Sequence, residues 1–123
     1  LLRNKQVDLA YVFGSSATGR QHPTSDLDIA ILLRPNLSAR VLFERRLELI
    51  AGLSKFFKRE IDLVLLNEAR STLLRFRIIK EGKLIYASNM GLRAIFECRV
   101  MSEYFDFLPT LQYFSQAYVQ RNS

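Results

Sequence analysis

The sequence predicts an α/β (α+β) protein in which a small mixed sheet is flanked by helices, with a long helix at the C-terminal end. One observation is that short runs rich in Val, Ile and Leu alternate with longer stretches whose apolar residues recur every three or four positions. Another is that 49% of the 123 residues are hydrophobic, which is enough to build a core. We therefore expect one domain over residues 1–123, with its core at 7–86 and a C-terminal helical segment at 91–120.

The first two strands are marked by their composition and by the turn formers between them. Residues 7–13 are β-branched and aromatic, and the run ends abruptly at Gly14 and Ser15. Residues 16–25 are small, polar and rich in turn formers, which indicates a connection. Residues 26–33 are predicted to form the second strand, and their nearly unbroken apolar run indicates burial on both faces.

A helix and a third strand come next. Ser38 is a suitable N-terminal cap for a helix that runs to about residue 58. The residues expected to form the buried face of this helix are Phe43, Leu47, Ile50 and Phe57. Residues 60–66 are predicted to form the third strand, and their apolar content places it in the interior of the sheet.

A shorter helix and a short strand complete the predicted sheet. Residues 68–81 have a helical pattern, and Gly82 is suited to end that helix. Residues 83–86 are expected to add a short strand. The chain therefore alternates strands and helices, as expected for a sheet with helices packed on it.

Residues 92–119 predict a long helix, which Pro109 is expected to kink or to divide in two. The apolar stripe of this helix, spaced by threes and fours, consists of Phe96, Val100, Tyr104, Phe107, Leu111, Phe114 and Tyr118. Most of these residues are expected to form a core face. Phe105 and Tyr113 lie off the stripe, and a partner surface is one candidate explanation for them.

Composition excludes several classes of protein. The single cysteine, Cys98, permits no disulfide within the chain, and with the single histidine, His22, it leaves no zinc cluster. The longest uncharged run, at 107–120, is too short to cross a bilayer, and no signal peptide is visible. We therefore expect a cytoplasmic protein that does not enter a membrane.

The chain is basic, with a formal net charge of +6. This balance suits a ligand that carries phosphate, and it is also consistent with a basic surface of no special function. The basic residues around the second helix are Arg70, Arg75, Arg77, Lys80 and Lys83. They lack the aromatic interleaving that RNA-binding proteins use, so no direct contact with nucleic acid is expected.

Two aspartates at the start of the second strand form half of a candidate site. Asp26 and Asp28 are two positions apart, so on a strand both carboxylates point to the same face. Adjacent carboxylates repel each other and cost free energy unless a cation lies between them. Mg²⁺ meets that need, because it prefers oxygen ligands and binds through carboxylates together with substrate phosphates.

The end of the first strand supplies the other half. Gly14 lets the backbone approach a ligand closely, and free amides together with the Ser15 hydroxyl can hold a phosphate. Asp62 lies within an apolar strand, where a carboxylate without a partner is costly. It is a candidate ligand for a second ion or a candidate base, and local pairing with Lys58 or Arg59 is the alternative. Together these parts indicate metal-assisted phosphoryl or nucleotidyl transfer.

Gly-Ser, ten residues, Asp-x-Asp and an aspartate in a later strand together resemble the signature of the DNA polymerase β-like nucleotidyltransferases. The run Phe-Gly-Ser-Ser-Ala-Thr-Gly-Arg resembles the smallest members, the minimal nucleotidyltransferases. The likeness covers residues 7–86. It implies a polymerase β-like nucleotidyltransferase fold and a single nucleotidyltransferase domain. It also implies transfer of a nucleoside monophosphate from a magnesium-bound nucleoside triphosphate to an acceptor.

The resemblance also implies a role for individual residues. The residues implied to be catalytic and to bind two Mg²⁺ ions are Asp26, Asp28 and Asp62. The residues implied to bind the nucleotide are Gly14, Ser15, Gly19, Arg20 and Ser25. Among these, Gly19 matches a family glycine that shapes the turn on the phosphate side.

Residues 97–108 resemble the C-terminal helix of the MntA-type antitoxins, which are encoded beside a HEPN-type ribonuclease toxin called HepT. This likeness implies a hetero-oligomer in which AMP is transferred from ATP to a tyrosine of the toxin and silences it. Two alternatives remain open. The first is a binding module that occludes its partner without catalysis. The second is an antibiotic-modifying nucleotidyltransferase that acts on an aminoglycoside without a partner protein.

Overall fold

The computed structural model describes residues 2, 5–14 and 26–122, with side chains as far as residue 110. In this part of the chain the elements are β1 (Val7–Phe13), β2 (Leu27–Leu33), α1 (Ala39–Phe57), β3 (Ile61–Leu65), α2 (Thr72–Glu81), β4 (Lys83–Ala87) and α3 (Met90–Asn122). The observed β1, β2 and β4 agree with the predicted strands to within one residue at each end, so the turn formers marked their limits correctly.

The four strands form one mixed sheet in the order β3-β2-β1-β4. The central strand β1 is antiparallel to both β2 and β4, whereas β2 and β3 are parallel and are joined through α1. The mixed sheet predicted from the sequence is therefore confirmed. The interior position predicted for β3 is wrong, because β3 is an edge strand of the described sheet.

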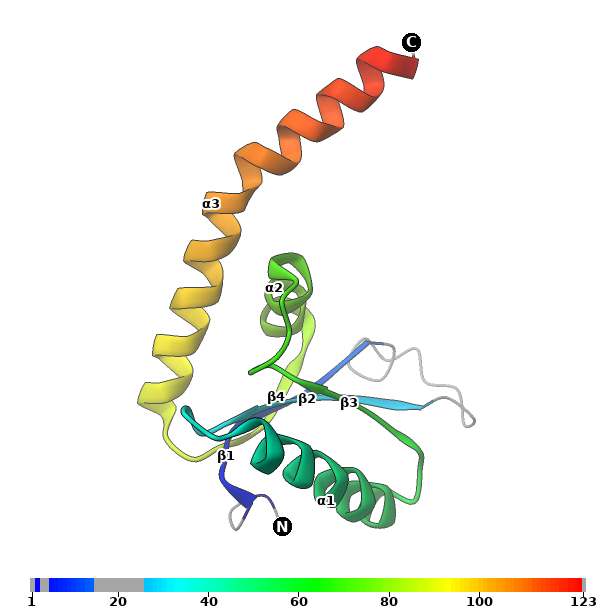
Figure 1. Ribbon diagram of the computed structural model, residues 1–123, viewed down its shortest axis with the longest axis vertical. Coiled ribbons are helices and arrows are strands. Elements are labelled where there is room, and N and C mark those ends of the chain that lie inside the picture. The colour runs from blue at the N-terminus through cyan, green and yellow to red at the C-terminus, as the bar shows by residue number, and fades with distance from the viewer. Residues whose placement is uncertain (1, 3–4, 15–25, 123) are drawn as a thin grey trace.

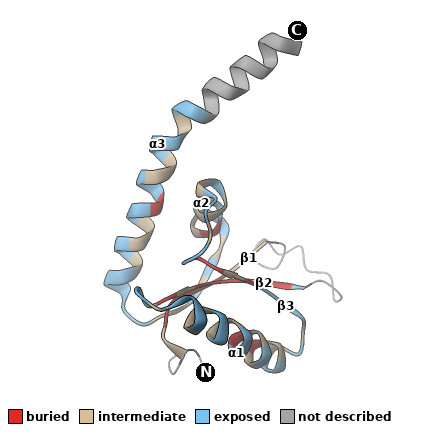
Figure 2. Ribbon diagram, viewed as in Figure 1, coloured by how far each residue is buried: buried red, intermediate tan, exposed pale blue. Residues whose placement is uncertain are grey.

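Helices cover both faces of the sheet, with α1 on one face and α2 and α3 on the other (Figure 1). The cluster on the α1 face includes Leu49 and Leu53 of α1. The cluster on the other face includes Ile78 of α2, and Phe96 of α3 packs against it. Buried residues are concentrated in β1 and β2, which hydrogen-bond to a neighbour on each side (Figure 2).

Helix α1 begins and ends where the sequence predicted. The Ser38 hydroxyl accepts a hydrogen bond from the Val41 amide at 3.2 Å, and Lys58 ends the helix in the left-handed conformation. Its buried face agrees with the predicted one only in part. Ile50 and Phe57 pack against the core as predicted, together with the buried Leu49 and Leu53. Phe43 and Leu47 were predicted wrongly, because they are 59% and 52% exposed.

Helix α2 starts later than expected, at Thr72 rather than at residue 68. The Ser71 hydroxyl accepts a hydrogen bond from the Leu74 amide at 3.1 Å and so caps the helix at this point. Gly82 ends the helix as predicted, and its amide donates to the Ile78 carbonyl.

Helix α3 is one continuous helix with Pro109 inside it, so of the two effects expected of Pro109, a kink or a division, the division is excluded. Its first half packs on α2 through an ion pair between Arg75 and Glu103 at 2.6 Å. One position further on, the Tyr104 ring stacks on Phe76 with 3.7 Å between the ring centroids. Beyond these contacts α3 extends away from the rest of the protein (Figure 1). None of the described helices is long and apolar enough to span a membrane.

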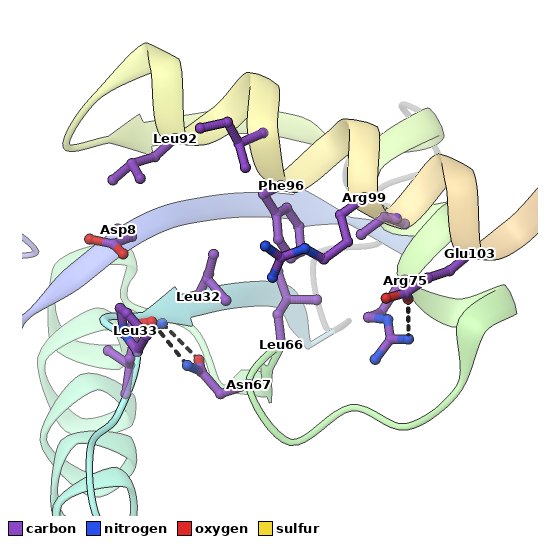
Figure 3. A pocket seen from close by; sticks show the side chains of 13 residues that line it. Asp8, Leu32, Leu33, Leu66, Asn67, Arg75, Leu92, Phe96, Arg99 and Glu103 are labelled. Atoms are coloured by element: carbon purple, nitrogen blue, oxygen red, sulfur yellow. Dashed lines mark hydrogen bonds and ion pairs between the residues drawn. The ribbon is translucent and has the colours of Figure 1, made fainter.

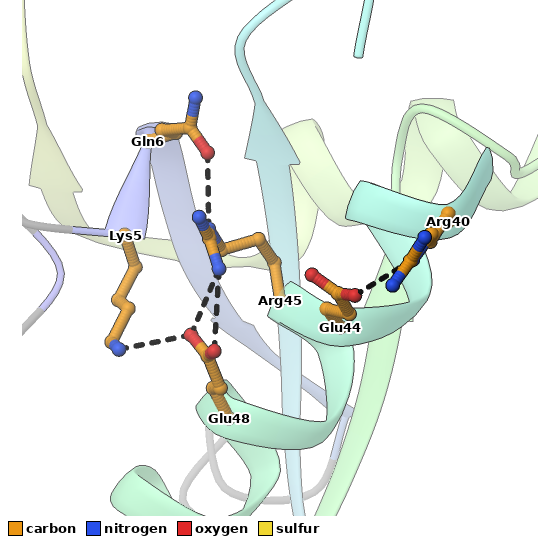
Figure 4. Close-up of polar contacts among 6 residues, drawn as sticks. All are labelled: Lys5, Gln6, Arg40, Glu44, Arg45 and Glu48. Atoms are coloured by element: carbon orange, nitrogen blue, oxygen red, sulfur yellow. Dashed lines mark hydrogen bonds and ion pairs between the residues drawn. The ribbon is translucent and has the colours of Figure 1, made fainter. Parts of the chain in front are cut away.

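The residues before β1 are fastened to α1 by polar contacts (Figure 4). Glu48 accepts from Lys5 at 2.9 Å and from Arg45 at 3.1 Å, and Arg45 also donates to the Gln6 side chain at 3.0 Å. The hydrogen bond from Lys5 is the main reason why the pKa of Glu48 is lowered. These side chains are partly exposed to solvent, so they orient the segment more than they stabilise the fold.

A buried hydroxyl connects β1 to α3. Tyr11 is 1% exposed, and its hydroxyl donates to Glu97 at 3.0 Å, while Arg93 donates to the same carboxylate oxygen at 3.2 Å. Burial, followed by the hydrogen bond to Glu97, raises the pKa of Tyr11 well above its ordinary value. The hydroxyl therefore remains protonated and keeps donating at physiological pH.

We expect Tyr11→Phe to lower the free energy of unfolding by about 1–2 kcal/mol, because a hydrogen bond to a charged acceptor is lost inside the protein. Chemical denaturation measures the change. Tyr86→Phe is the matched control, because the Tyr86 hydroxyl makes no hydrogen bond to another described residue. Equal losses in the two variants would show that the contact between Tyr11 and Glu97 contributes nothing.

Candidate functional site

The candidate site lies at one end of the sheet, where three neighbouring strands place chemically active groups. Asp28 of β2 and Asp62 of β3 are direct partners in the parallel register. On its other side Asp28 is opposite Phe13, the last residue of β1, so Gly14 follows beside it. Residues distant in the sequence are therefore brought together by strand pairing alone.

Both carboxylates belong to the face of the sheet that α2 and α3 cover. Side chains alternate between faces along a strand, so Asp28 shares a face with Ala30, and Asp62 shares a face with Val64. Ala30 and Val64 belong to or pack against the cluster that contains Ile78 of α2. The two carboxylates therefore lie side by side on one face of the sheet.

The carboxylate pair is electrostatically strained. Asp28 is partly buried, and its pKa is raised first by that burial, then by the charge of Asp62 and a hydrogen bond with it, and last by the charge of Asp26. Two carboxylates in this position retain a proton or attract a cation, because either one relieves the repulsion. A pair of oxygen donors of this kind fits a hard divalent cation.

Gly14 is required by the geometry beside Asp28. Its φ of +73° lies in the left-handed region that side chains disfavour. A Cβ atom on Gly14 would overlap the Asp28 carboxylate oxygen and lie 3.2 Å from the carboxylate carbon. Only glycine therefore lets the end of β1 come this close to Asp28.

The structure describes part of the predicted site. Asp26 lies directly before β2 and is exposed, and its charge acts on Asp28. Within the described residues, no three His, Cys, Asp or Glu side chains are gathered into a metal-holding group, and the Asp28–Asp62 pair is what the sheet brings together. The remaining predicted positions lie outside the described residues: Ser15, Gly19, Arg20 and Ser25.

A comparison with known protein families relates this geometry to an established one. Residues 1–90 match the family described as polymerase beta, nucleotidyltransferase. The match contains Gly14, Asp28 and Asp62 and covers most of the chain. The chain belongs to this nucleotidyltransferase family. The fold expected from the sequence motif is thereby confirmed.

Individual relatives in the nucleotidyltransferase family resemble the chain in more detail than the family match does. The chain is 33% identical over 106 residues to the protein adenylyltransferase MntA of Shewanella oneidensis, covering 85% of this chain and 72% of the relative. A crystal structure of a toxin–antitoxin with AMP-PNP matches 97% of this chain and 90% of its own, with 31% identity and a TM-score of 0.70. A chain in the structure of a tri-AMPylated Shewanella oneidensis HEPN toxin in complex with MNT antitoxin is also similar. The match covers 97% of this chain and 87% of the other, with 28% identity and a TM-score of 0.64.

Sequence reasoning did not find a groove of about 450 Å³ between α3 and the sheet of this nucleotidyltransferase (Figure 3). It lies near the end of β2 at Leu33, whereas Asp28 is near the start of that strand. Asn67 closes one side, and its side chain exchanges two hydrogen bonds with the Leu33 backbone at 2.8 and 2.9 Å. No motif marks the groove, because it exists only through the position of α3.

Proposed function

We propose that this nucleotidyltransferase transfers AMP from ATP to a tyrosine hydroxyl of a HEPN-type toxin, with which it forms a hetero-oligomer, and so acts as the antitoxin. The observation that carries the proposal is the paired Asp28 and Asp62 beside Gly14, in a chain of this family. The reaction is proposed to take place in the cytoplasm, in a single domain formed by residues 1–123.

The proposed site requires Mg²⁺, and the donor set fits it. Asp28 and Asp62 supply adjacent carboxylates whose repulsion a cation would relieve, and Asp26 is the third proposed ligand. When bound, two Mg²⁺ ions would neutralise charge on the triphosphate and make the acceptor hydroxyl easier to deprotonate. Proton uptake by Asp28 competes with metal binding, so the raised pKa of Asp28 makes cation binding favour higher pH.

The proposed reaction is an in-line displacement at the α-phosphorus of ATP. The tyrosine oxygen forms a bond to the α-phosphorus, and the bond from that phosphorus to the oxygen bridging to the β-phosphate breaks. The leaving group is pyrophosphate, and the hydroxyl proton passes to a carboxylate, for which exposed Asp62 is the candidate, and then to water. Catalysis by such a site rests mostly on positioning and on electrostatic stabilisation.

The nucleotide is proposed to lie across the end of β1. Gly14 brings the backbone at the end of β1 against Asp28, one of the two paired carboxylates. Ser15 is proposed to contact the triphosphate there. The other proposed nucleotide-binding residues are Gly19, Arg20 and Ser25, all in the connection from β1 to β2.

The choice of acceptor rests on the relatives. One relative is called a protein adenylyltransferase, and a similar antitoxin was crystallised with an AMPylated HEPN toxin. A related toxin–antitoxin was crystallised with AMP-PNP, which supports ATP as the donor here. The likeness extends over 97% of this chain and therefore includes α3 as well as the sheet.

The test is to incubate the purified chain with Mg²⁺ and labelled ATP, with and without the HEPN-type toxin encoded beside it. We expect AMP on a tyrosine of the toxin, detected by peptide mass, and none when Asp26→Asn replaces the wild-type chain. Omission of Mg²⁺ should also abolish the label.

The other outcomes identify the alternatives. A tight complex that carries no AMP, and that forms equally well with Asp26→Asn, would establish a partner-occluding module instead. Transfer of AMP to an aminoglycoside in the absence of any partner would establish an antibiotic-modifying enzyme.

A further inference from the structure

Helix α3 is covered by its own chain on one side only. On that side of α3, Val100 is 2% exposed, and the Tyr104 ring stacks on Phe76 of α2. Beyond Tyr104 the helix leaves the body of the protein (Figure 1), and Phe105 and Phe107 are exposed. Isolated helices are only marginally stable in water, so this arrangement calls for additional packing.

A second apolar stripe runs along another side of α3. Its members, here called the outer stripe, are Ala94, Cys98, Met101, Phe105 and Leu108. Their separations of four, three, four and three positions keep them on one side of the helix, as in helices that pair with another helix. Met101 and Phe105 are 41% and 56% exposed, and Cys98 is exposed as well.

The groove side of α3 is apolar too. Leu92 and Ile95 line the mouth of the groove and are exposed. The helix thus carries apolar residues on its packed side, on the outer stripe and on the groove side. Of these three sides, only the packed one is buried against the described part of the chain.

A second copy of this chain is a poor candidate for the protein that covers the outer stripe. From Ala94 to Leu108 the outer stripe is about 21 Å long, and on a helix about 10 Å wide it offers about 210 Å². Two such faces would bury about 420 Å², roughly a third of the 1,200 Å² at the lower end of stable interfaces. Each copy also carries a net charge of +6, which opposes self-association.

A larger partner protein avoids both difficulties. It reaches the outer stripe and the groove together, and an acidic rim on it would meet the exposed Arg99 of α3 and the exposed Arg77 and Lys80 of α2. We propose that the outer stripe and the groove side of α3 form the docking surface for the toxin. The surface of the toxin that contacts them is apolar and helical, and it has an acidic rim. Naming the toxin as the occupant rests on the proposed function.

The test uses Cys98, the only cysteine of the chain, as a native probe within the outer stripe. Alkylation of Cys98 by a maleimide is followed by mass in the free chain and in its complex with the toxin. We expect the rate to fall by at least about tenfold in the complex, because a docked partner excludes solvent from the stripe. An unchanged rate in a stable complex would overturn the docking surface.

Two variants separate docking from folding. Met101→Glu and Phe105→Glu are both at exposed helical positions, and each is expected to weaken toxin binding at least about thirtyfold, as a charge buried at the centre of an interface does. Phe56→Glu, at a 72% exposed position of α1 on the other side of the sheet, is the matched control and should bind like wild type. Circular dichroism verifies that all three are folded.

The results also separate this proposal from the proposed function. Wild-type binding by both stripe variants, with AMP still transferred to the toxin, overturns the docking surface and leaves the function standing. Loss of binding in both, with no AMP transfer by the wild-type complex, supports the docking surface and overturns the function. Protection of Cys98 that increases with the concentration of the chain alone would identify a second copy as the occupant.

Discussion

Replacing Asp28 by asparagine is expected to abolish AMP transfer and at the same time to stabilise the fold. The substitution removes a proposed metal ligand at the centre of the carboxylate pair, so we expect activity to fall by at least about a hundredfold. It also removes a partly buried charge that Asp62 and Asp26 repel. Transfer assays and thermal unfolding of the same preparation measure the two effects.

The stability gain should depend on pH in a defined direction. Because the pKa of Asp28 is raised in the folded protein, the folded state holds the proton more tightly than the unfolded chain does. Wild-type stability is therefore lost as pH rises from about 4, the ordinary pKa of aspartate, through the raised pKa. The Asp28→Asn advantage in Tm should be full at pH 7 and should disappear towards pH 4.

Glu44→Gln is a suitable control for this experiment. It neutralises an exposed carboxylate on α1 whose one ion pair among the described residues is with Arg40, so transfer and Tm should both stay near wild type. If Asp28→Asn instead unfolds at a lower temperature than wild type at pH 7, the strain assigned to the carboxylate pair is absent. If it transfers AMP at the wild-type rate, Asp28 is not part of the site.

Replacing Gly14 by alanine is the second large effect that we expect. The new Cβ would collide with the Asp28 carboxylate, and the residue would also be held at positive φ. The backbone conformation alone costs about 1–2 kcal/mol. Displacement of Asp28 by the methyl group should reduce AMP transfer by about a hundredfold, because small shifts in a positioned site have effects of that size.

Gly91→Ala is the matched control for Gly14→Ala. Gly91 lies in the first turn of α3, where the nearest neighbour of a new Cβ is the flexible side chain of Asn89, at 3.0 Å. Transfer should be unaffected, and stability should change by less than about 1 kcal/mol. A Gly14→Ala enzyme with wild-type activity would contradict the close packing of β1 against Asp28.

The sequence predicted the fold well where local signals decide and less well where packing decides. The caps at Ser38 and Ser71 are local hydrogen bonds, and only the first was used to place a helix start. The edge position of β3 is not local, because apolar side chains on both faces do not say how many neighbouring strands are present. On α1, Phe43 and Leu47 have helical spacing as good as that of the buried leucines, so periodicity alone placed these two residues in the core wrongly, although it placed Ile50 and Phe57 correctly.

The candidate site was predictable because its parts lie at fixed positions on regular strands. The alternation of side chains placed Asp28 on one face, and the parallel pairing of β2 with β3 brought Asp62 next to it. The raised pKa of Asp28 was not predictable, because it depends on burial in the folded protein. The groove beneath α3 was missed for a related reason, since its walls come from segments with no shared motif.

The edge position of β3 also bears on solubility. A free strand edge presents backbone groups that another chain can pair with, which is a common route to aggregation. β3 is short, and its second residue is the exposed Asp62, so a negative charge stands on the strand that would otherwise be the best template for strand addition. Asp62 therefore serves the chain as a deterrent to intermolecular sheet formation, independently of any part that it has in catalysis.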